Sequence, residues 1–310
     1  MISKKLVDCF PADFLPDSSA EIQKSLSKKS AFRFASLCKV YETLCSQLDD
    51  LPEEVSLIAH STYDPKELLL IYPDGLNCQI KLCESLLSIF AYTFFYKLKQ
   101  LFRSLNLVLS SKSFFSAGIL SRSVIEEVAF FFFFLRRIEE SSPKIIQSLK
   151  NAKRGRINTQ KWSEEISQRF FDVFSNLDRA TRGSSYDWSK LHNSLEGSQL
   201  PNKINILECV RDLADRSELP IVDYYTLFSE MVHPNFGSHT MVIKTRIPVS
   251  NQIGQIVIGE TSNMESSMWF FEIFSEGLDE VVKLTLVALE RGNRQLKFFK
   301  EISNLYDRHT

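Results

Sequence analysis

Two histidines, a proline, an asparagine and a glycine fall close together in the stretch YTLFSEMVHPNFGSHT, which begins at Tyr225. Tyr225, Ser229 and His233 are spaced four residues apart, so on a helix their polar ends lie along one side. Pro234 disfavours helical geometry at the residue before it, which predicts that this helix ends at Val232 or His233. Because the partial negative charge of a helix C-terminus favours protonated imidazole, His233 could act as an acid.

The loop that follows this helix is a natural place to hold a phosphate or a second chain, with Asn235 and Gly237 turning the backbone away from His233. The alternative is that His233 is a C-cap residue that donates to the last carbonyls of the helix. His239 is expected to be an ordinary loop or strand residue. Neither histidine has a metal-ligating neighbour at a useful spacing, so we expect no metal site.

A second polar pair interrupts the apolar helix FFSAGILSRSVIEEVAFFFFFLRR. Arg122 and Glu126 are four residues apart and therefore face each other on an otherwise apolar stripe. If that stripe is buried, desolvation of both ions costs about as much as their attraction returns, so the pair is weak evidence of stabilisation. A role in a functional site is one reason to keep such a pair. The alternative is that Arg122 extends to the rim of the core or caps a neighbouring helix.

A basic tract, LKNAKRGRINTQKW, could contact a nucleic-acid backbone, and its Trp162 could stack on one base. Its cations are Lys150, Lys153, Arg154, Arg156 and Lys161. A solvated basic face or loop is the other interpretation of such a charge run. Over the whole chain, 37 Lys and Arg residues are balanced by 38 Asp and Glu residues. Any attraction to RNA must therefore be local.

The chain carries no marks of a secreted or membrane protein. Its six cysteines include no CxxC pair and no Cys/His grouping at zinc spacing, which indicates a reducing compartment. The start, MISKKLVDCFPADF, lacks the long apolar core of a secretory signal. The apolar run 128–135 has eight residues, far fewer than the roughly 20 that a spanning helix needs. We therefore expect a cytoplasmic protein that does not contact a membrane.

Helices must position these residues, because the chain has 25 Phe but only 10 Gly and 10 Pro. Apolar spacing predicts helices over residues 18–50, 81–109, 112–140, 163–177, 204–217, from Pro220 onward, and 263–306. Strand-and-turn patterns predict β-hairpins in 56–80 and 241–259, and 181–202 is predicted to be a surface loop. The predicted fold class is mainly α, with an N-terminal helical region (1–80) and a helical bundle (81–310) that carries the second hairpin.

The motifs Arg122-x-x-x-Glu126 and Tyr225-x-x-x-Ser229-Glu230-x-x-His233-Pro234-Asn235 resemble uncharacterised bacterial helical proteins of the HEPN (higher eukaryotes and prokaryotes nucleotide-binding) superfamily. The resemblance implies that residues 81–310 form a HEPN-like bundle that dimerises, with polar residues of its central helices at the dimer cleft. It also implies a metal-independent ribonuclease of a toxin–antitoxin or antiphage system, which needs no cofactor. The catalytic set would be Arg122, Glu126, Tyr225, Ser229, His233 and Asn235.

The sequence departs from the HEPN pattern at one point. Many members use an arginine and a histidine four to six residues apart to stabilise the cleaved phosphate and to move the proton of the 2′-OH. No arginine precedes any of the five histidines of this chain at that spacing. Either Arg122 replaces the missing arginine beside His233, or the fold has lost ribonuclease chemistry.

Two classes of function therefore compete. The first is a HEPN-like effector that cuts or binds RNA without metal. The second is a non-catalytic interaction protein, in which the same polar residues fix helix register and the basic tract or the 241–259 hairpin docks a partner protein from the same operon. Other hydrolases and nucleotide-binding enzymes find little support, since the chain has no GxSxG, P-loop, GxGxxG or HExxH motif.

Overall fold

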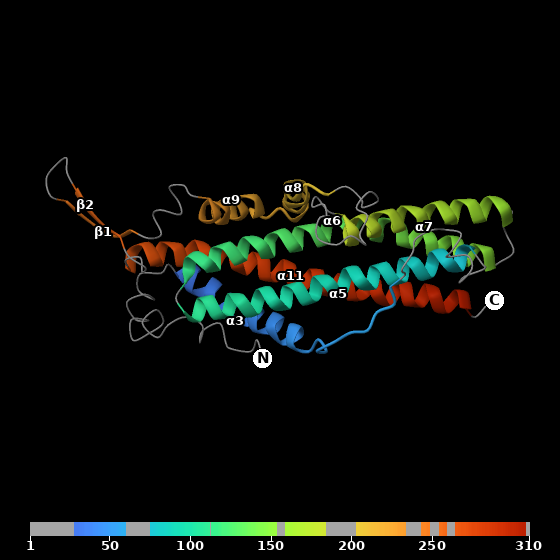
Figure 1. The fold of residues 1–310 in the computed structure, drawn as a ribbon, viewed down its shortest axis with the longest axis horizontal. Helices are drawn as coiled ribbons and strands as arrows, with labels where there is room; N and C mark the ends of the chain where they lie inside the picture. Colours follow the sequence, from blue (N-terminus) through green and yellow to red (C-terminus); the bar gives the residue numbers. More distant parts are fainter. Residues whose placement is uncertain are drawn as a thin grey trace, which may run out of the picture. The chain divides into compact units, whose positions relative to one another are not determined.

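The computed structural model describes residues 28–59, 75–111, 113–153, 159–183, 203–233, 243–248, 254–258 and 264–307. This part of the chain is mainly α, as predicted (Figure 1). Its helices are α3 (Lys28–Asp49), α5 (Gly75–Ser110), α6 (Phe114–Lys153), α7 (Thr159–Arg182), α8 (Ile206–Ser217), α9 (Ile221–Val232) and α11 (Met264–Asp307). Strands β1 (Ile243–Pro248) and β2 (Gly254–Ile258) pair antiparallel, which confirms the hairpin predicted at 241–259.

The chain divides into two compact units that are built from interleaved segments. Unit 1 comprises Met1–Pro52, Tyr96–Ala129 and Val210–Val287, and unit 2 comprises Glu53–Phe95, Phe130–Cys209 and Ala288–Thr310. Helices α5, α6 and α11 each contribute one part to each unit. The candidate residues Arg122, Glu126 and Tyr225 all belong to unit 1.

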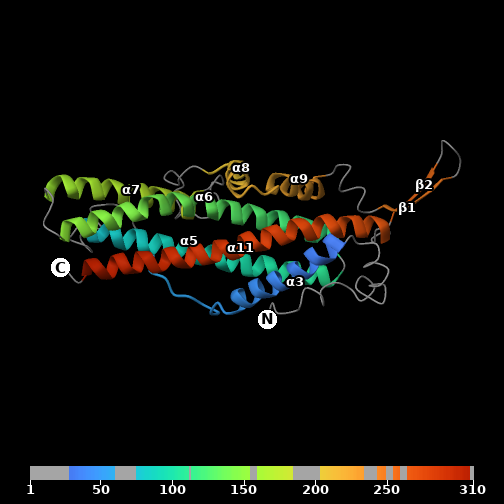
Figure 2. The ribbon, with the colours of Figure 1, turned by 180° about the vertical axis from the view of Figure 1, so that it is seen from behind.

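Unit 1 packs α3 beside the second half of α5 (Figure 2). The hydroxyl of Tyr41 donates to Oδ1 of Asn106 at 2.5 Å, and its ring meets the edge of Phe102 with 5.6 Å between centroids. The buried Lys99 donates to the carbonyl of Leu51 at 3.1 Å, just beyond the end of α3. A cation at this place is favoured by the partial negative charge of the helix C-terminus.

Unit 2 has a phenylalanine core. Phe94 of α5 stacks on Phe131 of α6 with ring centroids 3.9 Å apart and planes 6° apart. Gly292 of α11 gives these rings room, because a methyl group at this position would lie 2.9 Å from Cζ of Phe131 and 3.1 Å from Cζ of Phe95. The apolar run 128–135 is therefore core, as its length predicts, and no helix of the described residues is long and apolar enough to cross a membrane.

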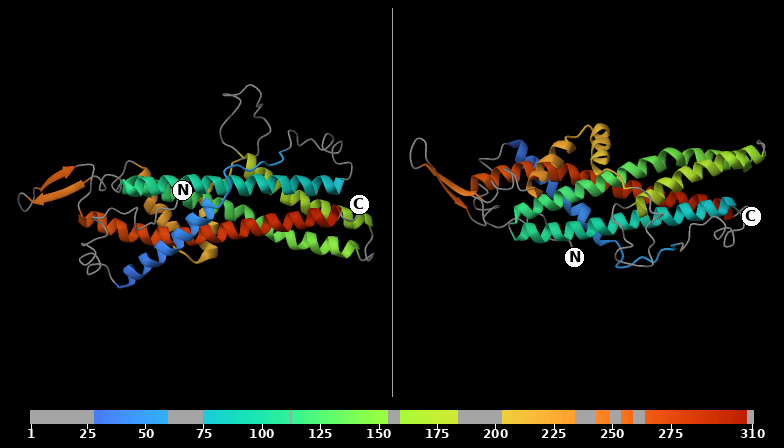
Figure 3. Two further views of the ribbon diagram at one scale, coloured as in Figure 1. Left: turned by 90° about the horizontal axis from the view of Figure 1, so that it is seen from below. Right: turned by 45° about the horizontal axis from the view of Figure 1, so that its top comes forward.

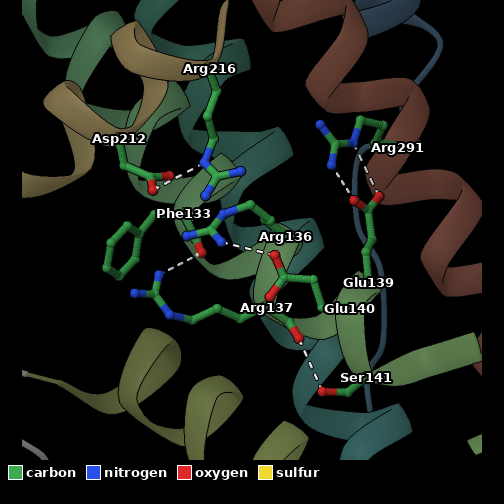
Figure 4. Close-up of polar contacts among 9 residues, drawn as sticks. All are labelled: Phe133, Arg136, Arg137, Glu139, Glu140, Ser141, Asp212, Arg216 and Arg291. Carbon is green, nitrogen blue, oxygen red and sulfur yellow. Dashed lines mark hydrogen bonds and ion pairs between the residues drawn. The ribbon is translucent and has the colours of Figure 1, made fainter. Parts of the chain in front are cut away.

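Charged side chains of α6 follow the phenylalanine run at Phe133 (Figure 4). The Nε of Arg291 donates to Oε1 of Glu139 at 3.1 Å, and the same two side chains share a second hydrogen bond. The guanidinium of Arg137 lies 3.4 Å from the ring centroid of Phe133. The Glu139–Arg291 pair joins α6 to α11 within unit 2, whereas the cation–π contact of Arg137 with Phe133 lies within α6.

Helix α6 corrects one prediction, because it continues through Pro143 to Lys153 instead of ending near residue 140. A proline inside a helix loses one backbone hydrogen bond, here to the carbonyl of Glu139, and crowds the preceding turn. The hydroxyls of Ser141 and Ser142 donate to the carbonyls of Arg137 and Ile138 in that turn. The flanking apolar positions stay buried on both sides of the proline, and this burial outweighs the local cost.

The start of α5 corrects a second prediction. Residues 75–80 begin this helix and are not part of a hairpin, and residues 60–74 of the predicted hairpin lie outside the described residues. Buried Cys78, Ile80 and Leu82 continue the apolar stripe of α5, so the helical period extends further toward the N-terminus than expected. Residues 181 and 182 of the predicted surface loop (181–202) belong to α7, and its residues from 184 onward lie outside the described residues.

Candidate functional site

Helix α9 carries the tyrosine of the candidate site. It follows Pro220, and Asp223 lies in its first turn, where a carboxylate is favoured by the helix dipole. At the other end, His233 has extended backbone angles of φ −94° and ψ 144°, and its N–H donates to the carbonyl of Ser229. The helix therefore ends at Val232, which confirms the boundary that Pro234 predicts.

Helix α9 lies beside α6 and α11 within unit 1 (Figure 3). Gly118 of α6 and Gly277 of α11 let it pack closely. A methyl group built on Gly118 of α6 would overlap the sulfur of Met231. One on Gly277 of α11 would lie 3.0 Å from the ring of Tyr224 and 3.2 Å from the ring of Phe228. Met231, Tyr224 and Phe228 are all buried. These contacts fix α9 against α6 on one side and against α11 on another.

Three side chains meet between α6 and α9, and we call them the polar cluster: Arg122, Glu126 and Tyr225. The Nε of Arg122 donates to Oε1 of Glu126 at 3.1 Å, and its Nη2 donates to the hydroxyl of Tyr225 at 3.1 Å. The Tyr225 hydroxyl in turn donates to the same Oε1 of Glu126 at 3.0 Å. Every member of the cluster therefore contacts both others.

The polar cluster is partly open to solvent. The side chains of Arg122 and Glu126 are 21% and 29% exposed, whereas Tyr225 is 7% exposed. An arginine has more N–H donors than these two bonds use. The remaining donors of Arg122 bond none of the described residues, so the outer edge of its guanidinium could hold an anion.

Ser229 and His233, two other predicted members of the site, lie apart from the polar cluster. The hydroxyl of Ser229 donates to the carbonyl of Tyr225 at 2.6 Å and so stays on its own helix. His233 is exposed, eight residues beyond Tyr225, which is about 12 Å along a helix axis. The structure thus brings Arg122, Glu126 and Tyr225 together but does not bring His233 to them within one chain. Asn235 lies outside the described residues.

The basic tract spans the end of α6 and the start of α7. Lys150 and Lys153 belong to the last turns of α6, and Lys161 belongs to the first turn of α7. Arg154 and Arg156 fall between the two helices, outside the described residues. The cations of the basic tract that the structure describes therefore belong to helices.

Thiol and metal chemistry find no support in the described part of the chain. Burial raises the pKa of the Cys83 thiol, and burial together with nearby Glu42 raises the pKa of Cys38 to about 11. Both thiols therefore stay protonated at neutral pH, whereas a nucleophilic cysteine needs its thiolate. No group of three or more His, Cys, Asp or Glu side chains in the described residues could hold a metal ion.

The sequence did not predict that Gly118 and Gly277 make room for side chains of α9. Gly118 lies one turn before Arg122 on the same helix, and this spacing was the available signal. A glycine within an apolar helix lowers helix propensity, so its presence calls for a packing reason.

Comparisons of this chain with protein-family models, with curated proteins and with solved structures gave no match. The geometry of the polar cluster therefore carries the functional argument.

Proposed function

We propose that this protein is a HEPN-like effector that binds and cleaves RNA without a metal ion, in a bacterial toxin–antitoxin or antiphage system. The observation that carries the proposal is the polar cluster, in which a cation, a carboxylate and a phenol from two helices share hydrogen bonds at a partly exposed place. A guanidinium edge binds phosphate oxygens well, and a carboxylate can accept a proton.

The cluster offers a proton path for attack by a ribose 2′-OH. The N–H donors of Arg122 that bond none of the described residues hold a non-bridging phosphate oxygen. The 2′-OH passes its proton to the Tyr225 oxygen while Tyr225 passes its own proton to Glu126, and the freed 2′ oxygen attacks phosphorus. The bond from phosphorus to the 5′ oxygen then breaks, and this leaving oxygen needs a proton from an acid.

His233 is the acid in this proposal, and it comes from the partner subunit of a homodimer. Within one chain His233 is about 12 Å along α9 from Tyr225, too far to protonate an oxygen bound at Arg122. His233 is exposed at the end of its helix, where it can reach into a second copy. A two-fold dimer would build two such composite sites.

The first test is cleavage of a mixed-sequence RNA in excess EDTA. Arg122→Ala should abolish cleavage and weaken RNA binding, because it removes the phosphate donor. Arg103→Ala is the matched control, since Arg103 is an exposed arginine of unit 1 that lies outside the polar cluster. Wild-type protein that neither binds nor cuts RNA, or an equal effect of both variants, would exclude the proposal.

A second candidate function is a non-catalytic interaction protein. The observation in its favour is that Glu126 already neutralises Arg122, so the polar cluster has little net charge to attract RNA. In this case Arg122→Ala lowers thermal stability, and the wild type shows no RNA affinity. A partner protein bound through the β1–β2 hairpin would then be lost when residues 243–258 are replaced by a short Gly-Ser linker.

A further inference from the structure

We propose that Gly118 and Met231 are a positioning pair that sets the register of α9 on α6 and thereby places the Tyr225 hydroxyl between Arg122 and Glu126. The Met231 sulfur occupies the space that a side chain at position 118 would fill. Neither residue touches the reacting groups, so both act through Tyr225. The catalytic consequence rests on the proposed function, whereas the geometric consequence does not.

The spacing along the two helices agrees with this role. Tyr225 lies six residues before Met231 on α9, and Val124, midway between Arg122 and Glu126, lies six residues after Gly118 on α6. Both separations amount to about 9 Å of helix rise. Since the contacts pair 118 with 231 and 122 and 126 with 225, the two helices run antiparallel and the separations match.

A small displacement of α9 would undo the cluster. The two hydrogen bonds of Tyr225 measure 3.1 Å and 3.0 Å, within the normal range for such bonds. A slip of one residue moves the phenol by about 1.5 Å along the axis and lengthens at least one of these bonds beyond that range. Met231 is buried, so it has little space to yield to an added methyl group at position 118.

The contact of α9 with α11 supplies the second restraint. Gly277 admits Tyr224 and Phe228, and Phe228 also meets Phe274 with ring centroids 6.0 Å apart. These rings fix the rotation of α9 about its axis. The contact of Gly118 with Met231 then fixes the position of α9 along its axis.

The test is the NMR signal of Tyr225 in protein labelled with ¹³C at Cζ of tyrosine. The signal is identified by its absence in Tyr225→Phe. Gly118→Ala should move it, and Gly118→Ala combined with Met231→Ala should return it toward the wild-type position. Gly292→Ala is the control, because its methyl group crowds Phe131 in unit 2 and should leave the Tyr225 signal in place.

Two outcomes overturn the positioning role: an unmoved Tyr225 signal in folded Gly118→Ala, or equal movement in Gly118→Ala and Gly292→Ala. If Gly118→Ala does not fold, Met231→Leu is used in its place. The branched leucine side chain fits poorly beside Gly118, so this variant should move the Tyr225 signal by a smaller amount. An unmoved signal in that variant is equally decisive against the pair. RNA cleavage, measured separately, should fall with the displacement. Wild-type protein without RNA cleavage refutes the proposed function alone.

Discussion

Tyr225 is the residue that links the two helices of the polar cluster, since its hydroxyl both accepts from Arg122 and donates to Glu126. Tyr225→Phe keeps the ring and removes both bonds. We expect the free energy of unfolding to fall by about 1–3 kcal/mol, because partly buried partners lose a hydrogen bond. We also expect RNA cleavage to be lost. Chemical denaturation and the RNA assay measure the two effects.

The control for this variant is Glu230→Gln, an exposed position of the same helix. It should change the free energy of unfolding by less than about 0.5 kcal/mol. Unchanged stability in Tyr225→Phe would show that the hydrogen bonds of the polar cluster do not stabilise the packing of α9.

Ser275 is a buried residue of α11 whose hydroxyl bonds none of the described residues, whereas Ser121 of α6, which is also buried, donates to the carbonyl of Ala117 at 2.8 Å. Replacement by alanine gains the same helix propensity at both positions. We expect Ser275→Ala to be more stable than Ser121→Ala by about 1 kcal/mol, the net contribution of one hydrogen bond. Chemical denaturation of both variants measures this difference, and equal free energies of unfolding would contradict the prediction.

The spacing of polar residues predicted the cluster only in part. Arg122 and Glu126 face each other, as their four-residue spacing indicates, and the structure adds Tyr225 to them. The spacing of Tyr225, Ser229 and His233 predicts that they share one side of a helix. It does not predict which other elements each of these residues contacts. Gly118 could not be recognised as a contact, because its role depends on a methionine over a hundred residues away.

At the scale of elements, α6 shows what local sequence signals miss. Pro143 is a helix breaker by its own chemistry, and the prediction that α6 ends near residue 140 followed from it. The burial of apolar residues on both sides keeps the helix intact. The end of α9 at Val232 was predicted correctly, because Pro234 disfavours helical geometry at the residue before it.

This conflict makes Pro143 a place where stability can be gained. Pro143→Ala restores an N–H that can donate to the carbonyl of Glu139, and it removes the crowding in that turn. We expect the free energy of unfolding to rise by about 1–3 kcal/mol. Lys144→Ala, the next exposed residue of α6, is the control and should change it little. A loss of stability in Pro143→Ala would show that the proline packs favourably.

At the scale of the whole molecule, the proposed dimer makes a quantitative prediction. Arg122→Ala and His233→Ala should each be inactive alone, because each breaks both composite sites. When the two variants are unfolded and refolded together, half of the dimers are mixed and each mixed dimer has one intact site of two. Activity should therefore recover to about one quarter of the wild-type value.

Refolding each variant alone is the control, and it should recover nothing. No recovery in the mixture would exclude a composite site that combines Arg122 of one subunit with His233 of the other. The total charge is nearly balanced, so we expect the recovered activity to depend on salt only through local contacts.

The interleaved order of the two units sets a limit on how this chain can form during translation. Each unit takes its segments from three distant parts of the polypeptide, and the last segment of each includes part of α11. Neither unit can be completed until that helix has left the ribosome, so apolar faces of α5 and α6 remain without their final partner while the chain grows. Nascent chains stalled before residue 264 should therefore bind chaperones, and neither unit should fold separately in them.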